Sequence, residues 1–224
     1  MAQTAAKESI IVLHIRVRFN QPAMFGFLSL YDLTGEGRWL EALISAADFT
    51  ETWTYAWSFP VRVLWPNHPF TKNSISGQSP VTLGGGGGDM YMAACAYVYY
   101  RLYVITGDMH YRDYAEFIHN NTRQANDVDG SFGYALPGLS HEGGRFGDQT
   151  FTNHYHWLPW VTYVEIDPTS RLYDSFGAYD IAEADRLSAE KRRHRNRIYD
   201  TYVKMRLQIS HREKSTKPSR VWWM

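Results

Sequence analysis

The sequence predicts an all-α fold in which helical hairpins form part of an α/α toroid, and three observations carry this prediction. A turn signature occurs twice, 72 residues apart, as LTGEGRW at residues 33–39 and ITGDMHY at residues 105–111. Segments that are apolar on every side alternate with amphipathic segments. Long connections separate one hairpin from the next. A repeat of this period is typical of stacked units that bury their apolar faces only against their neighbours.

The first hairpin is predicted over residues 22–57. Residues 22–33 are apolar on almost every side, which is typical of a helix that is buried all round. Gly35 is expected to end that helix. In the segment that follows, Trp39, Leu43 and Ala47 recur at helical spacing with charged residues between them. We therefore expect an amphipathic second helix on the outside of the toroid.

The same order repeats along the chain. Residues 89–105 are apolar all round and residues 108–123 are amphipathic. A third cycle is predicted to begin over residues 151–166, with its turn at Asp167-Pro168. Alternation of this kind indicates helices that belong in turn to an inner and an outer ring. Side chains expected in the core include Leu28, Tyr97 and Tyr100.

Two long connections, residues 58–88 and 124–150, each join an outer helix to the next inner helix. Both are therefore expected at the same end of the toroid. Long irregular segments inside a compact domain are usually functional, so this end is where we predict the site. The chain divides into an N-terminal extension (1–21), a partial toroid (22–179) and a basic C-terminal helix and tail (180–224), whose helix is predicted from Asp180 to about Ile209.

Composition is that of a globular domain, with 44% hydrophobic and 21% charged residues among 224. The net charge is zero, but residues 186–220 hold 12 Lys or Arg against 3 acidic residues, and the remainder holds 11 against 20. The acidic body suits carboxylate chemistry and disfavours nucleic acid as a partner. The basic run at residues 191–197 is interpreted as a solvated helix face, with an acidic partner or subunit as the alternative.

Cysteine content and hydropathy give further expectations. The single cysteine, Cys95, lies in an apolar run and is expected to be a buried small side chain. No stretch reaches the length of a membrane span, so no membrane partner is expected. The apolar run at residues 10–13 is short for a signal peptide, which leaves both a cytoplasmic and a secreted location open.

The sequence YVITGD at residues 103–108, which runs into Tyr111, resembles the helix-turn-helix of six-hairpin glycosidases. The Ser/Gly-rich connection before Asp89 and the His/Glu/Gly-rich connection before Asn153 are similar to that family too. The resemblance covers roughly residues 22–176. It implies an (α/α)6-type toroid, of the kind that hosts glycoside hydrolases and some polysaccharide lyases. Because only about three hairpins are present, we expect a partial toroid whose exposed apolar faces drive the formation of a homo-oligomer.

Five glycines at residues 84–88 precede Asp89 at the predicted start of an inner helix. Free backbone amides at a helix N-terminus favour anions. The Lys and Ser/Thr of a phosphate-binding loop do not follow, so no nucleotide is expected. Two interpretations of Asp89 stay open: an N-cap of the helix, or a catalytic or binding carboxylate at the mouth of the toroid.

A second cluster, HEGGRFGDQ, occupies residues 141–149. Glycosidic cleavage needs one carboxylic acid to protonate the leaving oxygen and a second carboxylate as base or nucleophile. Glu142 and Asp148 are the candidate pair, and either can act with Asp89 instead. The alternative is a polar loop with capping residues. The sequence therefore favours a glycoside hydrolase acting on an oligo- or polysaccharide.

Lyase chemistry is the alternative reaction. A base, His141 or Tyr155, would remove the proton α to a uronic carboxylate that Arg145 neutralises. His154 and His156 are predicted to bind substrate. A metal is not expected there, because their spacing does not place two ligands on one helix face and no cysteine assists. Neither a metal nor a cofactor is expected. A non-catalytic toroid that binds glycan or completes another chain is the third possibility.

Aromatic residues make up 16% of the chain, including 8 Trp and 16 Tyr. Such side chains suit both cores and sugar-stacking surfaces. Trp65 lies in the first long connection, away from helical periodicity, and is the best candidate for a sugar platform; Trp157 is a second candidate. The sequence assigns to the core the side chains of Trp53, Trp57 and Trp160.

Overall fold

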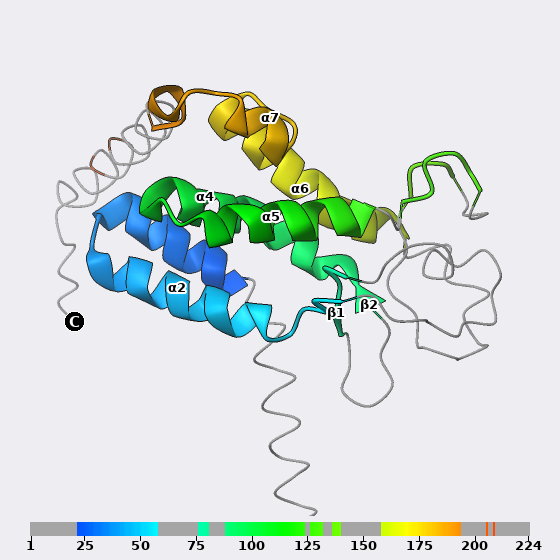
Figure 1. Cartoon of the computed structure of the whole chain (residues 1–224), viewed down its shortest axis with the longest axis horizontal. Coiled ribbons are helices and arrows are strands. Elements are labelled where there is room, and N and C mark those ends of the chain that lie inside the picture. The colour runs from blue at the N-terminus through cyan, green and yellow to red at the C-terminus, as the bar shows by residue number, and fades with distance from the viewer. Residues whose placement is uncertain are drawn as a thin grey trace, which may run out of the picture.

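The computed structural model describes residues 22–57, 76–80, 88–123, 126–131, 136–139 and 158–193, with residues 205 and 208. This part of the chain is mostly helical, which confirms the predicted all-α class. Its one sheet is a short antiparallel pair, β1 (Ser79–Pro80) and β2 (Gly88–Asp89). The helices, in chain order, are residues 22–34, α2 (Gly37–Glu51), the 3-10 helix η1 (Met90–Cys95), α4 (Ala96–Thr106), α5 (Met109–Thr122), α6 (Leu158–Phe176), α7 (Ile181–Asp185) and residues 189–193 (Figure 1).

The repeated turn signature forms the same turn twice. Gly35 and Gly107 have positive φ angles of 68° and 79°, and each donates its N–H at 2.8 Å to the carbonyl of the tyrosine four residues earlier. The preceding threonines, Thr34 and Thr106, donate to carbonyls four residues back at 2.8 and 2.7 Å. Each also accepts the amide two residues ahead. The sequence repeat is therefore also a repeat of backbone geometry.

The third turn lies at Gly177, ten residues beyond the predicted position, so the prediction at Asp167-Pro168 is wrong. Helix α6 runs through Pro168 without interruption. Gly177 has φ 68° and donates its N–H to the Tyr173 carbonyl at 2.7 Å. Proline removes one backbone hydrogen bond, and burial of α6 residues on both sides of it, such as Val164 and Leu172, holds the helix together.

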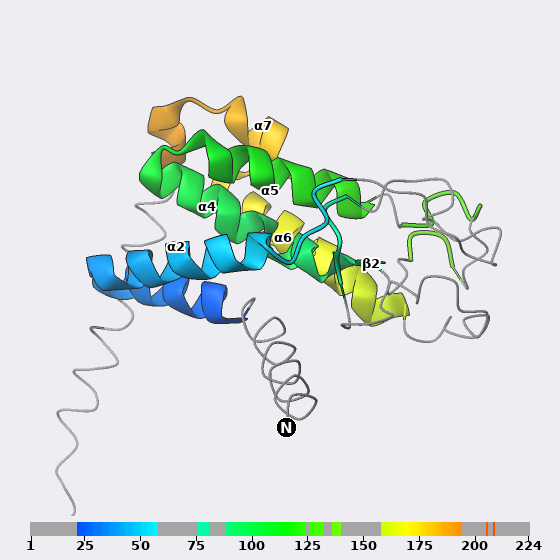
Figure 2. The ribbon, with the colours of Figure 1, turned by 60° about the horizontal axis from the view of Figure 1, so that its bottom comes forward.

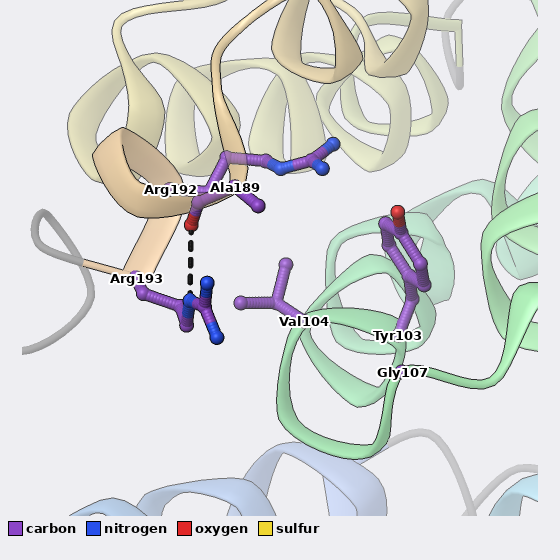
Figure 3. Close-up of a pocket in the computed structure, with 6 residues that line it drawn as sticks. All are labelled: Tyr103, Val104, Gly107, Ala189, Arg192 and Arg193. Carbon is purple, nitrogen blue, oxygen red and sulfur yellow. Dashed lines mark hydrogen bonds between the residues drawn. The ribbon is translucent and has the colours of Figure 1, made fainter.

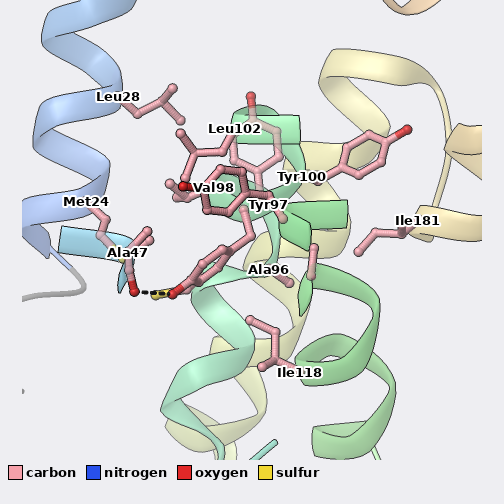
Figure 4. Packing of buried hydrophobic residues seen from close by; sticks show 14 of the residues in the cluster. Met24, Leu28, Ala47, Ala96, Tyr97, Val98, Tyr100, Leu102, Ile118 and Ile181 are labelled. Atoms are coloured by element: carbon pink, nitrogen blue, oxygen red, sulfur yellow. Dashed lines mark hydrogen bonds between the residues drawn. The ribbon is translucent and has the colours of Figure 1, made fainter. Parts of the chain in front are cut away.

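The core centres on α4, where every residue from Ala96 to Leu102 is buried. Leu28, Tyr97 and Tyr100 are 3%, 5% and 0% exposed, as predicted. Figure 4 shows side chains of residues 22–34 and of α2 facing this helix. Cys95 is also buried, and burial raises the pKa of its thiol to about 12, so it stays protonated at neutral pH.

Helices α2 and α5, which were predicted as outer helices, are amphipathic as predicted. In α2 the buried residues lie on one face and include Leu43 and Ala47. In α5 the buried face carries Tyr111, Ala115 and Ile118. Asp108 caps α5 by accepting the His110 amide at 2.9 Å, which satisfies one of the free N–H groups of the first turn.

The helix over residues 22–34 is not buried all round, which corrects the prediction. Only the stripe Met24, Leu28 and Asp32 is buried, while Gly26 and Ser29 are exposed. Trp57, expected in the core, is 68% exposed. An apolar sequence shows that a helix face avoids water, but it does not show that this chain supplies the element that covers it.

The chain after Gly177 packs onto the same helical body (Figure 2). Ile181 and Ala184 of α7 are buried in the core. Asp180 caps α7 by accepting the Glu183 amide at 2.7 Å. The charged helix predicted from Asp180 is interrupted, because residues 186–188 are not helical and separate α7 from residues 189–193. In the described part of the chain, no helix has the length and apolar character needed to cross a membrane.

Replacing Gly107 with alanine is expected to lower the free energy of unfolding by about 1–2 kcal/mol, because a Cβ disfavours the left-handed conformation. The same change at Gly26, in the exposed middle of the first helix, should raise it by about 0.5–1 kcal/mol. Neither added Cβ meets another atom within 4 Å, so backbone conformation alone separates the two variants. Urea unfolding measures both; equal effects would contradict the turn argument.

Candidate functional site

The ends of the long connections meet at one end of the helical body, which we call the loop end. It holds β1, β2, the C-terminus of α5 and the start of α6, opposite the turns at Gly35 and Gly107 (Figures 1 and 2). Residues 76–80 reach it from α2: the Tyr55 N–H donates to the Gln78 carbonyl at 2.9 Å, and the Gly77 N–H donates to the Tyr55 carbonyl at 2.8 Å. The connections therefore share one end, as the alternation of helices predicts.

Gly77 shows how tightly this segment packs on α5. Its φ is 84°, and an added Cβ would lie 3.0 Å from the Asn121 Cβ and 3.3 Å from the Phe117 carbonyl oxygen. Ser76, Gln78 and Ser79 are all buried. The position thus requires glycine for both its backbone conformation and its close approach to α5.

Asp89 lies at the loop end, where its backbone pairs with Ser79 in the β1–β2 ladder. It is followed by η1 rather than directly by an α-helix. The ladder fixes where the chain enters the inner helix. The Asp89 side chain lies outside the described residues, so its role as N-cap or as catalytic carboxylate stays a prediction.

The other predicted site residues fall in segments outside the described residues. They are Glu142, Asp148, His141, Arg145, His154, His156, Trp65, Tyr155 and Trp157. The structure does place the chain on either side of most of them. Asp127, which is fully buried, donates its N–H to the Leu139 carbonyl at 2.7 Å and accepts the Gly138 N–H at 2.6 Å. These hydrogen bonds join two parts of the second connection to each other, and α6 begins after the connection at Leu158.

A buried polar network joins the three helices that were predicted to be inner helices: residues 22–34, α4 and α6. Arg101 of α4 donates from Nη2 to Asp32 Oδ1 at 2.6 Å and from Nη1 to the Tyr97 hydroxyl at 3.1 Å. The Tyr97 hydroxyl in turn lies 2.8 Å from Ser175 Oγ of α6. Arg101 and Asp32 are only 1% and 8% exposed. The network fixes the register of the three helices and is closed to solvent, so we interpret it as structural.

An exposed row of polar side chains follows α6. Arg171 donates from Nε to Asp167 Oδ2 at 2.7 Å, and the Tyr163 hydroxyl lies 3.3 Å from Asp167 Oδ1. The Arg171 guanidinium lies 4.8 Å from the centre of the Phe25 ring, which belongs to the first helix. These residues were not among the expected site residues, because a turn was predicted at Asp167. The spacing of four residues between Tyr163, Asp167 and Arg171 is the sequence feature that indicates such a row on one helix face.

A cavity of about 170 Å³ lies between α4 and residues 189–193 (Figure 3). Its wall includes Tyr103, Val104, Arg192 and Arg193, and Arg193 Nε donates to the Ala189 carbonyl at 3.3 Å. The Arg192 guanidinium lies 5.5 Å from the Tyr103 ring centre. The cavity therefore offers an aromatic wall and cationic groups, but no paired carboxylates.

Asp185 of α7 pairs with Arg192 of the cavity wall and with Arg112 of α5. Its Oδ1 accepts the Tyr100 hydroxyl at 2.9 Å and Arg192 Nη1 at 2.8 Å, and its Oδ2 accepts Arg112 Nε at 2.6 Å. Burial raises the pKa of Tyr100 well above its usual range, so its hydroxyl stays a donor. This cluster fastens α7 to α4 and α5, and we interpret it as a structural joint.

Glu51 at the end of α2 pairs with His110 of α5, whose Nε2 lies 2.8 Å from Oε2. Burial raises the pKa of the Glu51 carboxyl, and the His110 hydrogen bond opposes that shift. Nearby, Tyr114 donates to Thr54 Oγ1 at 2.6 Å. These contacts connect the first hairpin to the second. In the described residues no group of three metal-ligating side chains comes together.

His119 of α5 is buried, and it gives folding a pH dependence. Burial, with the charge of Arg123 adding to it, lowers its pKa from 6.5 to about 4, while Asp180 acts in the opposite direction. Nε2 lies 3.2 Å from Arg123 Nη2 and 3.3 Å from Thr169 Oγ1. A guanidinium only donates, so Nε2 accepts and the ring is neutral.

Because the unfolded chain binds a proton at this histidine below pH 6.5 and the folded chain does so only near pH 4, stability should fall as pH drops through this window. His119→Gln is expected to lose less stability than the wild type between pH 7 and pH 5. Urea unfolding at both pH values measures this, with the exposed His110→Gln as control. Parallel losses in wild type and His119→Gln would contradict the assignment.

Compared with known proteins, the chain matches no family model, no curated protein and no solved structure. The resemblance to six-hairpin glycosidases therefore rests on the residues quoted for it. The features of the structure that bear on function are the helical repeat and the loop end.

Proposed function

We propose that the chain is a carbohydrate-active domain that hydrolyses glycosidic bonds in an oligo- or polysaccharide. The observation that supports this proposal most is the convergence of both long connections at the loop end. Asp89 is held there by β2, and the second connection, which carries Glu142 and Asp148, begins and ends there. Acid–base cleavage of a glycoside requires two carboxyl groups on either side of the scissile bond, and in this proposal the two connections supply them at the loop end.

In this proposal Glu142 protonates the leaving oxygen, and Asp148 or Asp89 acts as base or nucleophile. Trp65 and Trp157 supply flat apolar surfaces for sugar rings. The polar side chains proposed to hold the sugar hydroxyls are those of His141, Arg145, His154, Tyr155 and His156.

Incubation with a panel of glycans, with product masses read by mass spectrometry, tests this function. Hydrolysis adds one water to the products. Elimination by a lyase leaves an unsaturated end that absorbs in the near ultraviolet. Detection of such a product would contradict the hydrolase and support the lyase. Heat-denatured protein is the control for spontaneous cleavage.

A second candidate function is a non-catalytic toroid that binds glycan. The exposed aromatic side chains of the described region favour it, since Tyr163 and Tyr179 are 61% and 58% exposed. Glycan binding without turnover, abolished by Trp65→Ala, would support this candidate over the enzyme. Trp57→Ala is the matched control, because Trp57 is exposed but lies outside the proposed sugar platform.

We also propose that copies of the chain associate. A partial toroid leaves apolar side chains exposed, and on α6 the side chains of Tyr163 and Ile166 are 61% and 57% exposed.

A further inference from the structure

The cavity between α4 and residues 189–193 is large enough for one six-membered ring (Figure 3). Its volume is about 170 Å³, and a protein cavity of about 150 Å³ holds a benzene molecule. The cavity lies beside the turn at Gly107, opposite the loop end. A ligand bound here is therefore separate from the glycan of the proposed function.

The walls of this cavity are largely apolar. Tyr103 and Val104 pack against the hydrophobic core but are only partly buried, so neither is fully covered by the protein. The Tyr103 ring lies 5.7 Å from the ring of Tyr100, which is fully buried and holds it in place. Ala189 adds a methyl group from the opposite side. These surfaces favour an apolar ring over a sugar ring, whose hydroxyls need hydrogen-bond partners.

Of the two arginines in the cavity wall, Arg192 is held by protein groups. Its Nη1 donates to Asp185 Oδ1 at 2.8 Å and to the Tyr100 hydroxyl at 3.4 Å. Asp185 is itself held by Arg112 of α5, whose Nε donates to Oδ2 at 2.6 Å. Arg192 therefore fixes the position of residues 189–193, and with it the shape of the cavity.

Arg193 has no carboxylate partner in the described part of the chain. Its Nε donates to the Ala189 carbonyl at 3.3 Å, and Figure 3 shows its guanidinium beside Val104. The planar fork of a guanidinium matches the two oxygens of a carboxylate. A binding group for a carboxylate thus lies at the edge of an apolar cavity of ring size.

We propose that this cavity binds a small aromatic carboxylate. The ring lies between the α4 wall, formed by Tyr103 and Val104, and Ala189 on the other side. The carboxylate pairs with the Arg193 guanidinium. Such a ligand connects α4 to residues 189–193, and its binding stabilises the folded chain by mass action. The inference goes beyond the proposed hydrolysis and does not depend on it.

Titration of the full chain with benzoate at constant ionic strength, followed by NMR of the ligand, tests this proposal. Saturable binding is expected. It should be tighter than the binding of acetate, which lacks the ring, and of benzyl alcohol, which lacks the charge. Equal affinity for benzoate and either analogue would overturn the proposal, because ring and carboxylate must both contribute. Glucuronate, a carboxylate on a sugar ring, should bind more weakly; tighter binding of glucuronate would contradict the aromatic ligand.

Three variants locate the binding. Arg193→Met removes the charge of an exposed side chain and should weaken benzoate binding by about tenfold or more. Ala189→Leu fills the cavity without changing its charge and should abolish binding. Lys191→Met, in the same segment but outside the cavity wall, is the control and should bind benzoate as the wild type does. Equal losses in Arg193→Met and Lys191→Met would indicate general attraction to positive charge, and the proposed pairing would be wrong.

The alternative role of Arg193 is to offset the partial negative charge at the C-terminus of α4. In that case Arg193→Met would lower stability to urea, and the wild type would bind no benzoate. Absence of binding by the wild type overturns the proposal whatever the stability of the variant. No glycan is used in these measurements, so failure of the proposed hydrolysis is scored separately.

Discussion

Arg101→Met is expected to lower the free energy of unfolding by about 3–5 kcal/mol, the cost of breaking a buried ion pair by removing one partner. The change takes the guanidinium from Asp32, whose carboxylate is only 8% exposed and lies 2.6 Å from it. It also removes the donor to the Tyr97 hydroxyl, which connects α4 to Ser175 of α6. Urea unfolding followed by circular dichroism measures the loss.

Two further variants distinguish the cost of leaving the Asp32 carboxylate buried without its partner from the cost of losing an arginine side chain as such. Arg101→Met combined with Asp32→Leu should recover most of the stability, since apolar replacement of a whole buried pair is often neutral. Arg171→Met removes an exposed pair with Asp167 and should cost less than about 1 kcal/mol. If Arg101→Met cost no more than Arg171→Met, the buried network would not hold the inner helices in register.

Glu142→Gln is expected to lower turnover of a verified glycan substrate by about 10²–10⁴-fold, the usual contribution of general acid–base catalysis. The amide keeps the shape and hydrogen bonding of the side chain but has no titratable proton. Glycan affinity should therefore change little. Initial rates and equilibrium binding, measured on the same substrate, separate the two effects.

Asp148→Asn and Asp89→Asn are the parallel tests for the second carboxylate. The larger loss of turnover identifies which of the two acts with Glu142. Glu116→Gln, which alters a carboxylate that pairs with Arg112 on α5, is the control for a charge change away from the loop end. Wild-type turnover in all three site variants would contradict the proposal that these carboxylates carry out acid–base catalysis.

Much of the fold could be predicted because the signals are local. Turn glycines with positive φ, helical periodicity and N-caps each act within a few residues, so the helices of the first two hairpins fall where the sequence predicts them. The turn of the third hairpin was predicted at Asp167-Pro168 because proline commonly ends a helix. The sequence before Gly177 indicates the correct turn, but less strongly. LYDSFG at residues 172–177 repeats the leucine, tyrosine and glycine spacing of LYDLTG at residues 30–35.

What the sequence could not predict depends on contacts between distant segments. The apolar first helix gives no sign of which of its faces this chain covers. The pairs Arg101–Asp32 and Arg112–Asp185 join residues far apart in the chain, and nothing in local periodicity matches one charge to the other. For the site, helix alternation predicted that the connections share one end, while the positions of Glu142 and Asp148 within them stay predictions.

The central position of α4 has a consequence for how stability is distributed. Each turn closes over a few residues, so every hairpin can form from local contacts, which favours rapid folding. The first and third hairpins touch where Arg171 lies on the Phe25 ring, but α4 borders both of them, and every residue from Ala96 to Leu102 is buried. Opening of the first or third hairpin therefore leaves the other joint of α4 intact, so local unfolding is expected to begin in those hairpins and to reach α4 last.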